Sequence, residues 1–506
     1  MLSKFYLFSL LLCCLAGTAV AQSVPTQWCG TPDFDNPWLE AFQRGEIAEP
    51  RNNNTVVLPL RLHIVGRTNG TGYLPLEDLL DAMCLLQEDF VTTDILFYID
   101  GDIDTINNDT YYNAPDGGQG GLLMAFNNDP NVINCYFVNN PTSGTNQNGD
   151  PQLVCGYFNP QRDGMVMSIS CTNGEDHTWG HEMGHFLSLP HTFRGWEGTI
   201  ASTSQSAPIS VSGRQVEMAD GSNCSSAGDG FCDTPADYLS ERWTCNSMGE
   251  SIDSLVDPMG VKFKAPGWPI MGYANDECVD SFSTQQSSAM RTNAQIVRSG
   301  LILNIEPQLD SPDGGDIELL SPANANVEDF FDDITLSWSD LDNADFYVVQ
   351  ISRSSFFSII TAEYLVFDTT LRITEGLDDD KRYYWRVQPL SRFTTCPSIP
   401  TSATRNFRTG LVSGVSFDEQ LEAAVTISPN PVGSARRLFL TAANLPDATP
   451  IRWELYDMSG RLLQSAEEAP ATALNRAIDL NRAPAGIYSL RITQGRRLLT
   501  RRVVVQ

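Results

Sequence analysis

The sequence predicts an α+β domain built on a mixed sheet, followed by two β-sandwich domains. Strand and helix candidates alternate between residues 55 and 306, which is typical of a sheet with helices packed against it. Between residues 316 and 410 only strand-like runs remain, and the composition changes again at residue 427. The chain has 506 residues, and a prior of roughly 150 residues per domain is consistent with three domains.

Residues 1–21 have the features of a signal peptide. Lys4 supplies the positive start, residues 5–15 form an apolar run, and Ala19-Val20-Ala21 is a small-residue cleavage site. The apolar run is too short to span a membrane, and no later segment has about 18 consecutive apolar residues. We therefore expect a soluble, exported protein with no membrane span. The polar, proline-containing residues 22–54 are expected to be a propeptide or an N-terminal arm.

Regular periodicity in the region 55–306 locates its main elements. The predicted strands are Val56–Val65, Ile95–Ile99 and Val132–Val138, and the predicted helices are Leu76–Phe90 and Asp176–Leu189. This alternation is the basis for the mixed sheet with helices on it.

A linker at residues 307–315 separates this region from an aromatic-rich set of strand candidates. These are Ile334–Trp338, Phe346–Ile351 and Tyr383–Val387, divided by turn residues. The stretch resembles a fibronectin type III domain, with Trp338 in an early strand, Tyr384-Trp385-Arg386-Val387 late and Asn406-Phe407-Arg408-Thr409 at the end. The resemblance implies a β-sandwich over residues 316–410.

The formal charge of −30 argues against nucleic acid or an anionic membrane surface as partner, because both select for Lys and Arg. From Ile427 onward the sign reverses, since 11 Arg and no Lys face 6 acidic residues. Three blocks in residues 427–506 resemble the C-terminal sorting domain of type IX secretion: Ser428–Pro431, Leu455–Arg461 and Pro484–Tyr488. The resemblance implies the type IX machinery as a partner, whereas the open alternative is an ordinary small β-sandwich.

The cysteines indicate an oxidising compartment. Two of the 12 lie in the predicted signal peptide, and of the remaining ten only Cys396 lies beyond residue 280. Export makes disulfides expected. If the other nine paired among themselves, one would be left free, and spacing alone does not identify it.

The histidines carry the strongest functional signal. The chain has five, and four fall within fifteen residues: His177, His181, His185 and His191. His181 and His185 lie on one face of a helix, where both can reach one Zn²⁺ at about 2.0–2.1 Å. His191 completes a three-histidine site with one open position, and Glu182 is placed to act as the general base on water. His177 lies outside the ligand spacing, and we expect a structural role.

Three blocks in order resemble the metzincins, and within them the pappalysin-like (cytophagalysin) metallopeptidases. The blocks are Thr178–Phe193, Gly228–Pro235 and Ile270–Cys278, within a resemblance that covers roughly residues 55–300. The resemblance implies a metzincin α+β catalytic domain and a secreted zinc endopeptidase that cleaves proteins or peptides.

The resemblance also assigns roles to single residues. Met271 would belong to the Met-turn beneath the zinc, and Tyr273 would stabilise the oxyanion, unless it is a buried tyrosine that supports the turn. Asp229 and Thr234 would help to bind calcium, or else would form a hydrogen-bonded turn. Cys29, in the expected propeptide, would be a latency switch that fills the open zinc position, unless it forms a disulfide.

Two features qualify the resemblance. Metzincins place Gly seven residues after the first histidine, where this chain has Ser188, and a left-handed non-glycine residue costs about 1 kcal/mol. The chain after the Met-turn, which in metzincins lines a substrate pocket, carries Asp276 and Glu277, with Asp280 close by. These carboxylates predict cleavage before Arg or Lys, unless they point to solvent.

Two other functions stay open at this point. The appended β-sandwiches and Ser188 are compatible with a cell-surface binding protein that has a vestigial zinc site, although the intact Glu182 argues against it. A metalloesterase or amidase would use the same ligand spacing. A protease assay with and without a zinc chelator discriminates between the peptidase and the binding protein.

Overall fold

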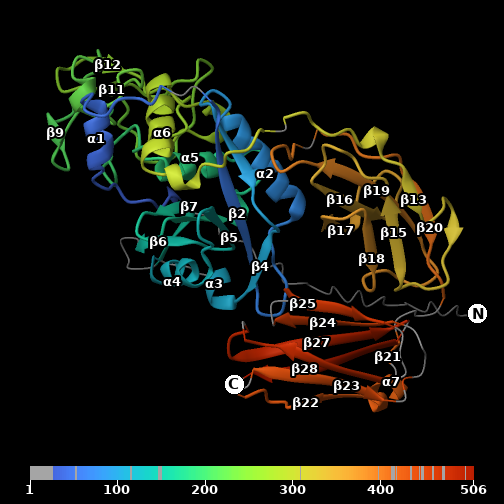
Figure 1. The fold of residues 1–506 in the computed structure, drawn as a ribbon. Helices are drawn as coiled ribbons and strands as arrows, with labels where there is room; N and C mark the ends of the chain where they lie inside the picture. Colours follow the sequence, from blue (N-terminus) through green and yellow to red (C-terminus); the bar gives the residue numbers. More distant parts are fainter. Residues whose placement is uncertain are drawn as a thin grey trace, which may run out of the picture.

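The chain forms three regions, coloured blue to yellow, yellow to orange and orange to red in Figure 1. The computed structural model describes residues 27–51, 54–113, 117–145, 151–307, 309–396, 398–411 and 416–505, the last range with gaps at 418, 434–435, 444, 446–449, 458–460, 470–472, 482 and 496. The predicted signal peptide lies outside these residues. Within them, no helix is long and apolar enough to cross a membrane.

A mixed eight-stranded sheet is the centre of the N-terminal region, with the order β1-β7-β8-β5-β2-β3, β4 beside β2 and β6 beside β7. Its strands are β1 (Gln27–Cys29), β2 (Val56–Gly66), β3 (Ile95–Ile99), β4 (Asp104–Asn107), β5 (Ile133–Val138), β6 (Thr142–Thr145), β7 (Pro151–Asn159) and β8 (Gly164–Ser168). β7 runs antiparallel to β8 and β6, whereas β1 pairs with β7 in parallel. The mixed sheet predicted from the sequence is confirmed.

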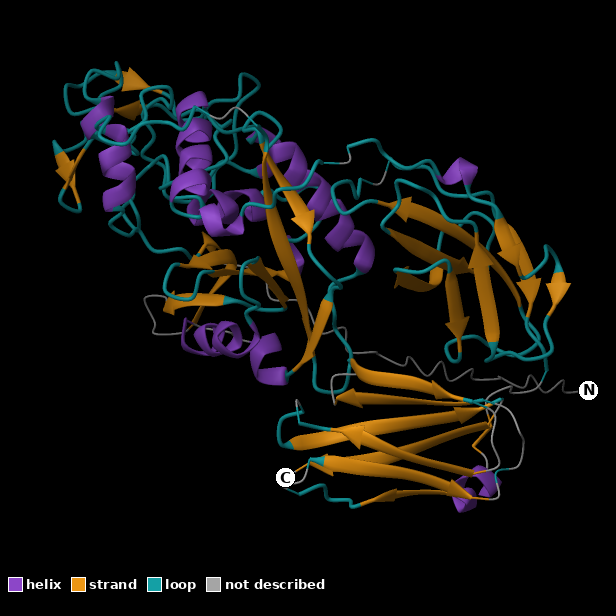
Figure 2. Cartoon of the chain, viewed as in Figure 1, coloured by secondary structure: helices purple, strands orange, loops and turns teal. Residues whose placement is uncertain are grey.

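Helices pack against this sheet and against one another (Figure 2). They are α1 (Pro37–Gln43), α2 (Leu76–Asp89), α3 (Asp109–Asn113), α4 (Gly117–Asn127), α5 (Thr178–Phe186) and α6 (Thr284–Ile296). Short hairpins follow α5, formed by β9 (Ser210–Val211) with β10 (Arg214–Gln215) and by β11 (Leu255–Val256) with β12 (Lys262–Phe263). One large core joins β2, α2, α5 and α6 through buried aliphatic and aromatic side chains.

The predicted elements are all present, and their ends differ most at α5 and at β19, which runs over Arg382–Leu390 where the sequence predicts Tyr383–Val387. Ile95–Ile99 and Ile334–Trp338 match in full, whereas the helix predicted over Asp176–Leu189 is only Thr178–Phe186. Asp176 instead accepts a hydrogen bond from the Thr178 backbone N–H at 2.9 Å, so its side chain satisfies a free donor at the helix start. At the other end, Ser188 has φ +85°, which no helix continues.

Among the described residues of the two C-terminal regions, the regular elements are nearly all strands (Figure 2). The first pairs a sheet ordered β13-β15-β18 with one ordered β14-β20-β19-β16-β17. Its strands are β13 (Leu319–Ser321), β14 (Asn326–Val327), β15 (Ile334–Trp338), β16 (Phe346–Ser352), β17 (Ile360–Val366), β18 (Thr370–Ile373), β19 (Arg382–Leu390) and β20 (Arg405–Arg408). Trp338 and Trp385 lie buried in its core.

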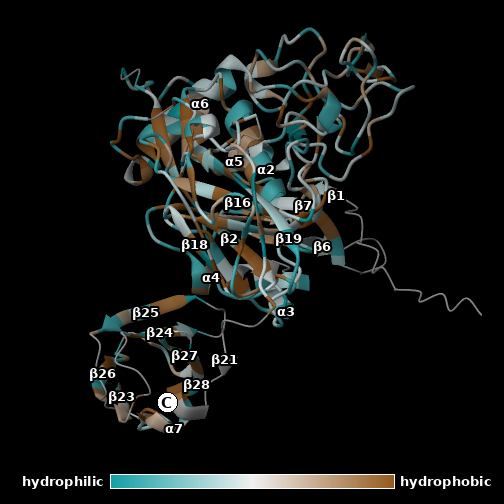
Figure 3. Ribbon diagram, turned by 90° about the vertical axis from the view of Figure 1, so that its right-hand side faces the viewer, coloured by the Kyte–Doolittle hydropathy of each residue, from teal (hydrophilic) through white to brown (hydrophobic). Residues whose placement is uncertain are grey.

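The second has the sheets β21-β28-β27-β24-β25 and β22-β23-β26 around a separate core. Its elements are β21 (Ser416–Phe417), α7 (Glu419–Ala424), β22 (Val425–Ser428), β23 (Arg437–Ala443), β24 (Ile451–Asp457), β25 (Leu462–Glu468), β26 (Ala473–Asp479), β27 (Gly486–Gln494) and β28 (Arg497–Val505). Hydropathy colouring shows this region below the rest of the chain (Figure 3).

Within the described residues four disulfides connect the chain, and one joins two regions. Cys84 on α2 pairs with Cys396 of the first sandwich, and the others are Cys155–Cys171, Cys224–Cys232 and Cys245–Cys278. The idea that the nine N-terminal cysteines pair among themselves is therefore wrong, because Cys396 takes one of them. Cys29 and Cys135 are both buried and free.

Candidate metal centre

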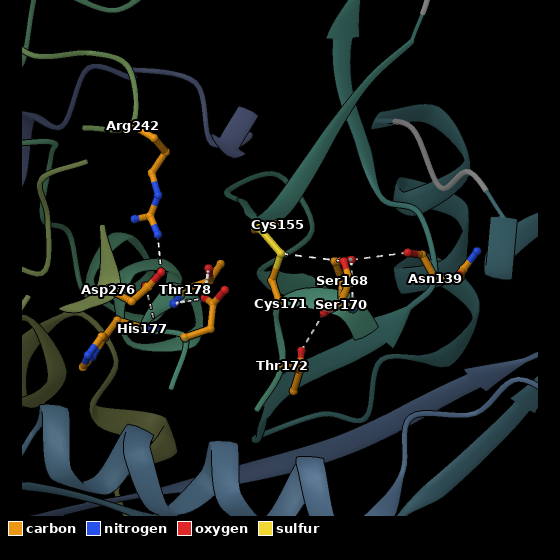
Figure 4. Close-up of a disulfide and its surroundings, with 11 residues drawn as sticks. Asn139, Cys155, Ser168, Ser170, Cys171, Thr172, His177, Thr178, Arg242 and Asp276 are labelled. Atoms are coloured by element: carbon orange, nitrogen blue, oxygen red, sulfur yellow. Dashed lines mark hydrogen bonds and ion pairs between the residues drawn. A yellow bond between two sulfur atoms is a disulfide. The ribbon is translucent and has the colours of Figure 1, made fainter. Parts of the chain in front are cut away.

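The start of α5 is fixed by acidic side chains. Besides the Asp176 cap, the Asp276 carboxylate accepts from the His177 backbone N–H at 3.1 Å and pairs with Arg242 (Figure 4). Carboxylates are favourable at a helix N-terminus, where the free N–H groups carry partial positive charge. His177 itself contacts Asp89, with 2.7 Å between Nδ1 and Oδ1. These contacts set the direction in which α5 presents its side chains.

The imidazole rings of His181, His185 and His191 converge on one point. The Nε2 atom of His185 lies 3.1 Å from that of His181 and 3.2 Å from that of His191. All three side chains are buried, with exposures of 0 to 3%. Burial, followed by the neighbouring histidines, holds the pKa of His181 and of His185 well below the usual value, so these two rings are neutral.

The partners of the other ring nitrogens determine the tautomers. Nδ1 of His181 lies 2.7 Å from the Ile270 carbonyl, and Nδ1 of His185 lies 2.8 Å from the Leu189 carbonyl. A carbonyl only accepts, so each Nδ1 carries the proton and each Nε2 presents a lone pair. Nδ1 of His191 faces the Glu197 carboxylate at 3.4 Å, which favours the same tautomer.

Lone pairs that face one another at this distance cannot hydrogen-bond. A shared cation would satisfy all three Nε2 atoms at once, and neutral imidazole suits zinc. The hydrogen bonds at Nδ1 are those that orient ligating histidines in metal sites. The donor set therefore fits the metal that the sequence predicts.

Glu182 lies next to this cluster, with no exposed surface. Its Oε2 accepts from the Thr31 hydroxyl at 2.6 Å, and its Oε1 has no hydrogen-bond partner among the described residues. Burial raises the pKa of Glu182 to about 7, and the bond from Thr31 opposes that rise. A nearby cation would also favour the charged carboxylate.

The segment from Trp28 to Thr31 covers the cluster. Cys29 Sγ lies 3.5 Å from His185 Nε2, and the Trp28 ring lies 4.5 Å from the His181 ring. Burial, followed by the charge of Glu182, raises the pKa of the Cys29 thiol well above its usual value. We call residues 27–51 the arm. Cys29 is free, as the latency hypothesis requires, so that hypothesis stays a prediction.

Gly30 explains how the arm fits so closely. Its N–H donates to the Gly156 carbonyl at 2.8 Å, and its own carbonyl accepts from the Ser143 hydroxyl at 2.7 Å. A Cβ on Gly30 would lie 2.5 Å from the Ser143 Cβ, so only glycine permits this approach.

The turn after α5 and the Ile270–Cys278 block complete the site. Tyr273 is buried, and its hydroxyl lies 3.4 Å from His191 Nε2. Burial raises its pKa well above the usual value, so the hydroxyl stays protonated. Met271 is fully buried beneath α5, where a Cβ on Gly184 would come within 2.4 Å of its sulfur.

The departure at Ser188 has a structural answer. Its φ of +85° is the left-handed conformation that the turn toward His191 requires. Its hydroxyl accepts from the side-chain amide of buried Asn293 on α6. This hydrogen bond offsets part of the conformational cost.

The predicted calcium residues contact each other. The Thr234 hydroxyl lies 2.9 and 3.0 Å from the two carboxylate oxygens of Asp229, which also accepts from the Phe231 N–H at 3.0 Å. These contacts describe a hydrogen-bonded turn, the alternative to calcium. Among the described residues, no group of three ligating side chains with converging atoms includes either residue.

The predicted specificity residues Asp276 and Glu277 differ in exposure and in ion pairing. Asp276 is half-buried and paired with Arg242, which also stacks on Trp28 at 4.4 Å, whereas Glu277 is exposed. The charge of Asp276 is therefore compensated inside the protein. A preference for Arg or Lys stays a prediction that depends mainly on Glu277 and Asp280, which are both exposed.

Sequence reasoning missed Thr31, Trp28, Glu197 and Asn293. Thr31 lies 151 residues before Glu182, and no periodicity connects them. Glu197 follows His191 in a loop, where spacing carries no information about contact. Only the position of Thr31 beside Cys29 could have drawn attention to it.

Comparisons with known proteins agree with part of this description. Residues 426–506 match the family described as the secretion system C-terminal sorting domain. An extracellular metalloprotease of Colletotrichum graminicola is 27% identical over 304 residues, which are 55% of this chain and 92% of that protein. One of Verticillium alfalfae is 26% identical over 307 residues, 55% and 93% of the two chains.

Solved structures match the chain only weakly. The FN1–FN3 domains of chicken CNTN1 match with 9% identity and a TM-score of 0.16, covering 36% of this chain and 66% of that one. Dimeric latent PorU of Porphyromonas gingivalis matches with 14% identity and a TM-score of 0.16, covering 40% of this chain and 21% of that one. The sequence relatives and the match to the sorting domain show that the chain is a distant homologue of extracellular metalloproteases and that it is secreted.

Proposed function

We propose that this protein is a secreted zinc endopeptidase. One observation carries the proposal: the lone pairs of His181, His185 and His191 converge beside the buried carboxylate of Glu182. The distant homology to extracellular metalloproteases supports it independently. The three histidines would hold the zinc, which when bound would supply a Lewis acid that polarises the scissile carbonyl.

The protein's own groups would carry out the proton transfers. Glu182 Oε1 has no competing partner among the described residues, so it is free to accept the proton of the attacking water. Glu182 would then deliver that proton to the leaving nitrogen. Tyr273, protonated and buried, would donate a hydrogen bond to the oxygen on which negative charge develops. Met271 would support the histidines from below without binding the metal.

The arm would hold the enzyme in a latent state. Cys29 lies against His185 at the cluster, and the Thr31 hydroxyl donates a hydrogen bond to Glu182. A thiolate at Cys29 would become favourable beside a cation, in contrast to the neutral thiol expected without one. Substrate could reach the histidines only after the arm had moved or been cut.

Calcium near Asp229 and Thr234 is a second part of the proposal. Asp229, Asp237 and Glu217 are all buried acids, and no arginine or lysine pairs with them among the described residues. Burial and mutual repulsion raise the pKa of Glu217 to about 9. A divalent cation with oxygen ligands would relieve this repulsion.

The test is a casein-cleavage assay on the secreted chain before and after a zinc chelator, with metal content measured alongside. We expect the chelator to remove zinc and activity together, and zinc to restore both. A chain that holds zinc in stoichiometric amount and cleaves no protein, with its arm removed, would instead be a binding protein with a vestigial site.

A further inference from the structure

Two arginines bind the arm close to the histidines. Asp33 Oδ1 accepts from Arg194 Nε at 3.0 Å, and Asp33 Oδ2 accepts from Arg214 Nε at 3.1 Å. The Arg194 side chain is only 5% exposed, and Asp33 is 27% exposed. Arg194 also donates to the Phe34 carbonyl at 3.2 Å.

Arg194 is attached closely to the candidate metal centre. Its backbone N–H donates to the His191 carbonyl at 3.2 Å, and Phe193 between them stacks on the His191 ring with 4.6 Å between centroids. His185, His191 and Arg194 line one small cavity against the arm. A group that binds Arg194 therefore has a fixed place relative to the histidines.

Both arginines depend on the arm for their counter-charge. In the part of the chain that the structure describes, Arg194 pairs with Asp33, and Arg214 pairs with Asp33 and Asp35; neither pairs with an acid of residues 55–306. A buried guanidinium without an anion is costly. When the arm leaves, the domain is left with two arginines that face the vacated cleft.

We propose that Arg194 and Arg214 form an anion-binding subsite that takes an Asp or Glu side chain of a protein substrate. The inference rests on the proposed function, and it treats the arm as the occupant that the subsite was built around. The arm lies along the sheet as a bound peptide would, because β1 adds to the edge strand β7. The bidentate contact of two guanidinium groups with one carboxylate gives the subsite its selectivity.

The position of the preferred acid follows from the arm. Asp33 is four residues from Cys29, whose sulfur lies at the histidine cluster. An extended chain advances about 3.3 Å per residue, so the subsite lies roughly three to four residues from the scissile bond. This position differs from the one next to the bond, where Glu277 predicts a basic residue.

The experiment uses a fluorescent peptide with the sequence of residues 27–36 and its D33N version. Each is titrated into the full chain carrying E182Q, which blocks cleavage, and D33N, which loosens the chain's own arm. We expect the Asp33 peptide to bind about 10- to 100-fold more tightly, the range for a hydrogen bond to a charged group. A D35N peptide is the matched control and should change affinity only slightly, because the Asp35 side chain is 89% exposed.

Variants of the arginines complete the test. R194Q and R214Q should each reduce the discrimination between the two peptides, whereas R408Q in the first sandwich should preserve it. If R194Q does not fold, as judged by thermal unfolding, the more exposed Arg214 gives the answer through R214Q. Equal binding of the Asp and Asn peptides, or full discrimination after R214Q in a folded chain, overturns the subsite.

Cleavage separates this inference from the proposed function. A positional peptide library, given to the arm-free chain with Glu182 intact, should show a preference for Asp or Glu three to four residues from the cut. Cleavage without that preference overturns the substrate role and leaves the peptidase standing. Absence of any cleavage overturns the peptidase, while the binding titration still reports whether the anion-binding subsite exists.

Discussion

The helix α5 and the arm supply the same site from two distant parts of the chain. α5 contributes His181, Glu182 and His185 within five residues, and the arm contributes Cys29 and Thr31 from about 150 residues earlier. Both sets are buried and lie within hydrogen-bonding distance of each other. The helix presents the atoms that the chemistry needs, and the arm occupies those atoms. Changes in the two segments should therefore affect activity in opposite directions.

The largest expected effect is on the helix side of this comparison. E182Q should lower cleavage by the arm-free chain about 10²- to 10⁴-fold, because the general base is lost. Zinc content should stay stoichiometric, since the three histidines remain. E175Q, an exposed change just before α5, is the matched control and should leave the rate unchanged. Cleavage by E182Q at the parent rate would show that another group is the base.

The second prediction concerns the metal. His191→Ala should lower the zinc content measured by elemental analysis, because one of three converging Nε2 donors is gone. His177→Ala is the control: His177 contacts Asp89 and lies outside the cluster, so zinc should be retained. Full zinc occupancy in His191→Ala would identify a different third ligand.

On the arm side, the sign should reverse. Thr31→Val keeps the shape of the side chain and removes the 2.6 Å hydrogen bond to Glu182. A charge-assisted bond of this kind is worth about 1.5–3 kcal/mol, so the arm should open more often, and the uncut chain should cleave about tenfold faster or more. Intact mass establishes that the arm is still attached, and Thr71→Val at an exposed loop serves as the control. Unchanged or lower activity would show that Thr31 does not restrain Glu182.

The comparison also explains what could be predicted from the sequence. His181, Glu182 and His185 are close in sequence, and helical geometry alone places them on one face. Thr31 and Asn293 reach the site through tertiary packing, which no local periodicity records. The strands β3 and β15 were predicted in full because each is a short β-branched or aromatic run between turns. The Cys84–Cys396 disulfide could not be, since it depends on how two domains meet.

A smaller effect, on the pH dependence of stability, is expected at the predicted calcium turn. The arm contacts this turn, because Gln43 donates to the Asp229 carbonyl at 2.8 Å. Burial raises the pKa of Asp237 to about 6, of Asp229 to about 7 and of Glu217 to about 9. The folded state therefore holds protons that the unfolded state has lost above about pH 4, so stability should fall as the pH rises from there through these values.

Calcium should remove this pH dependence. Thermal unfolding of the calcium-free chain should give a lower Tm at pH 9 than at pH 6, and millimolar calcium should restore the Tm at pH 9. Magnesium at the same ionic strength is the control, since it prefers a smaller octahedral site. A Tm at pH 9 that does not respond to calcium would leave the Asp229–Thr234 contact as a hydrogen-bonded turn and nothing more.

The smallest effect is expected at the end of α5, where Ser188 stands in place of glycine. Glycine at a left-handed position would gain up to about 1 kcal/mol. However, Ser188→Gly also removes the hydroxyl that accepts from the side-chain amide of Asn293, which is 2% exposed and whose Oδ1 already has no partner among the described residues. Leaving that amide unsatisfied costs about 1–3 kcal/mol, so the loss should outweigh the gain.

A double-mutant cycle isolates this balance. Ser188→Gly and Asn293→Ala should each lower the free energy of unfolding, and the double variant should lose about 1 kcal/mol less than their sum, because the two residues share one hydrogen bond. Urea unfolding of the zinc-loaded chain gives each value. Strict additivity would mean that the bond contributes nothing and that the left-handed serine is tolerated by the surrounding packing alone. Coupling would mean instead that Asn293 on α6 compensates for the missing glycine, and that the turn delivering His191 depends on a helix about one hundred residues farther along the chain.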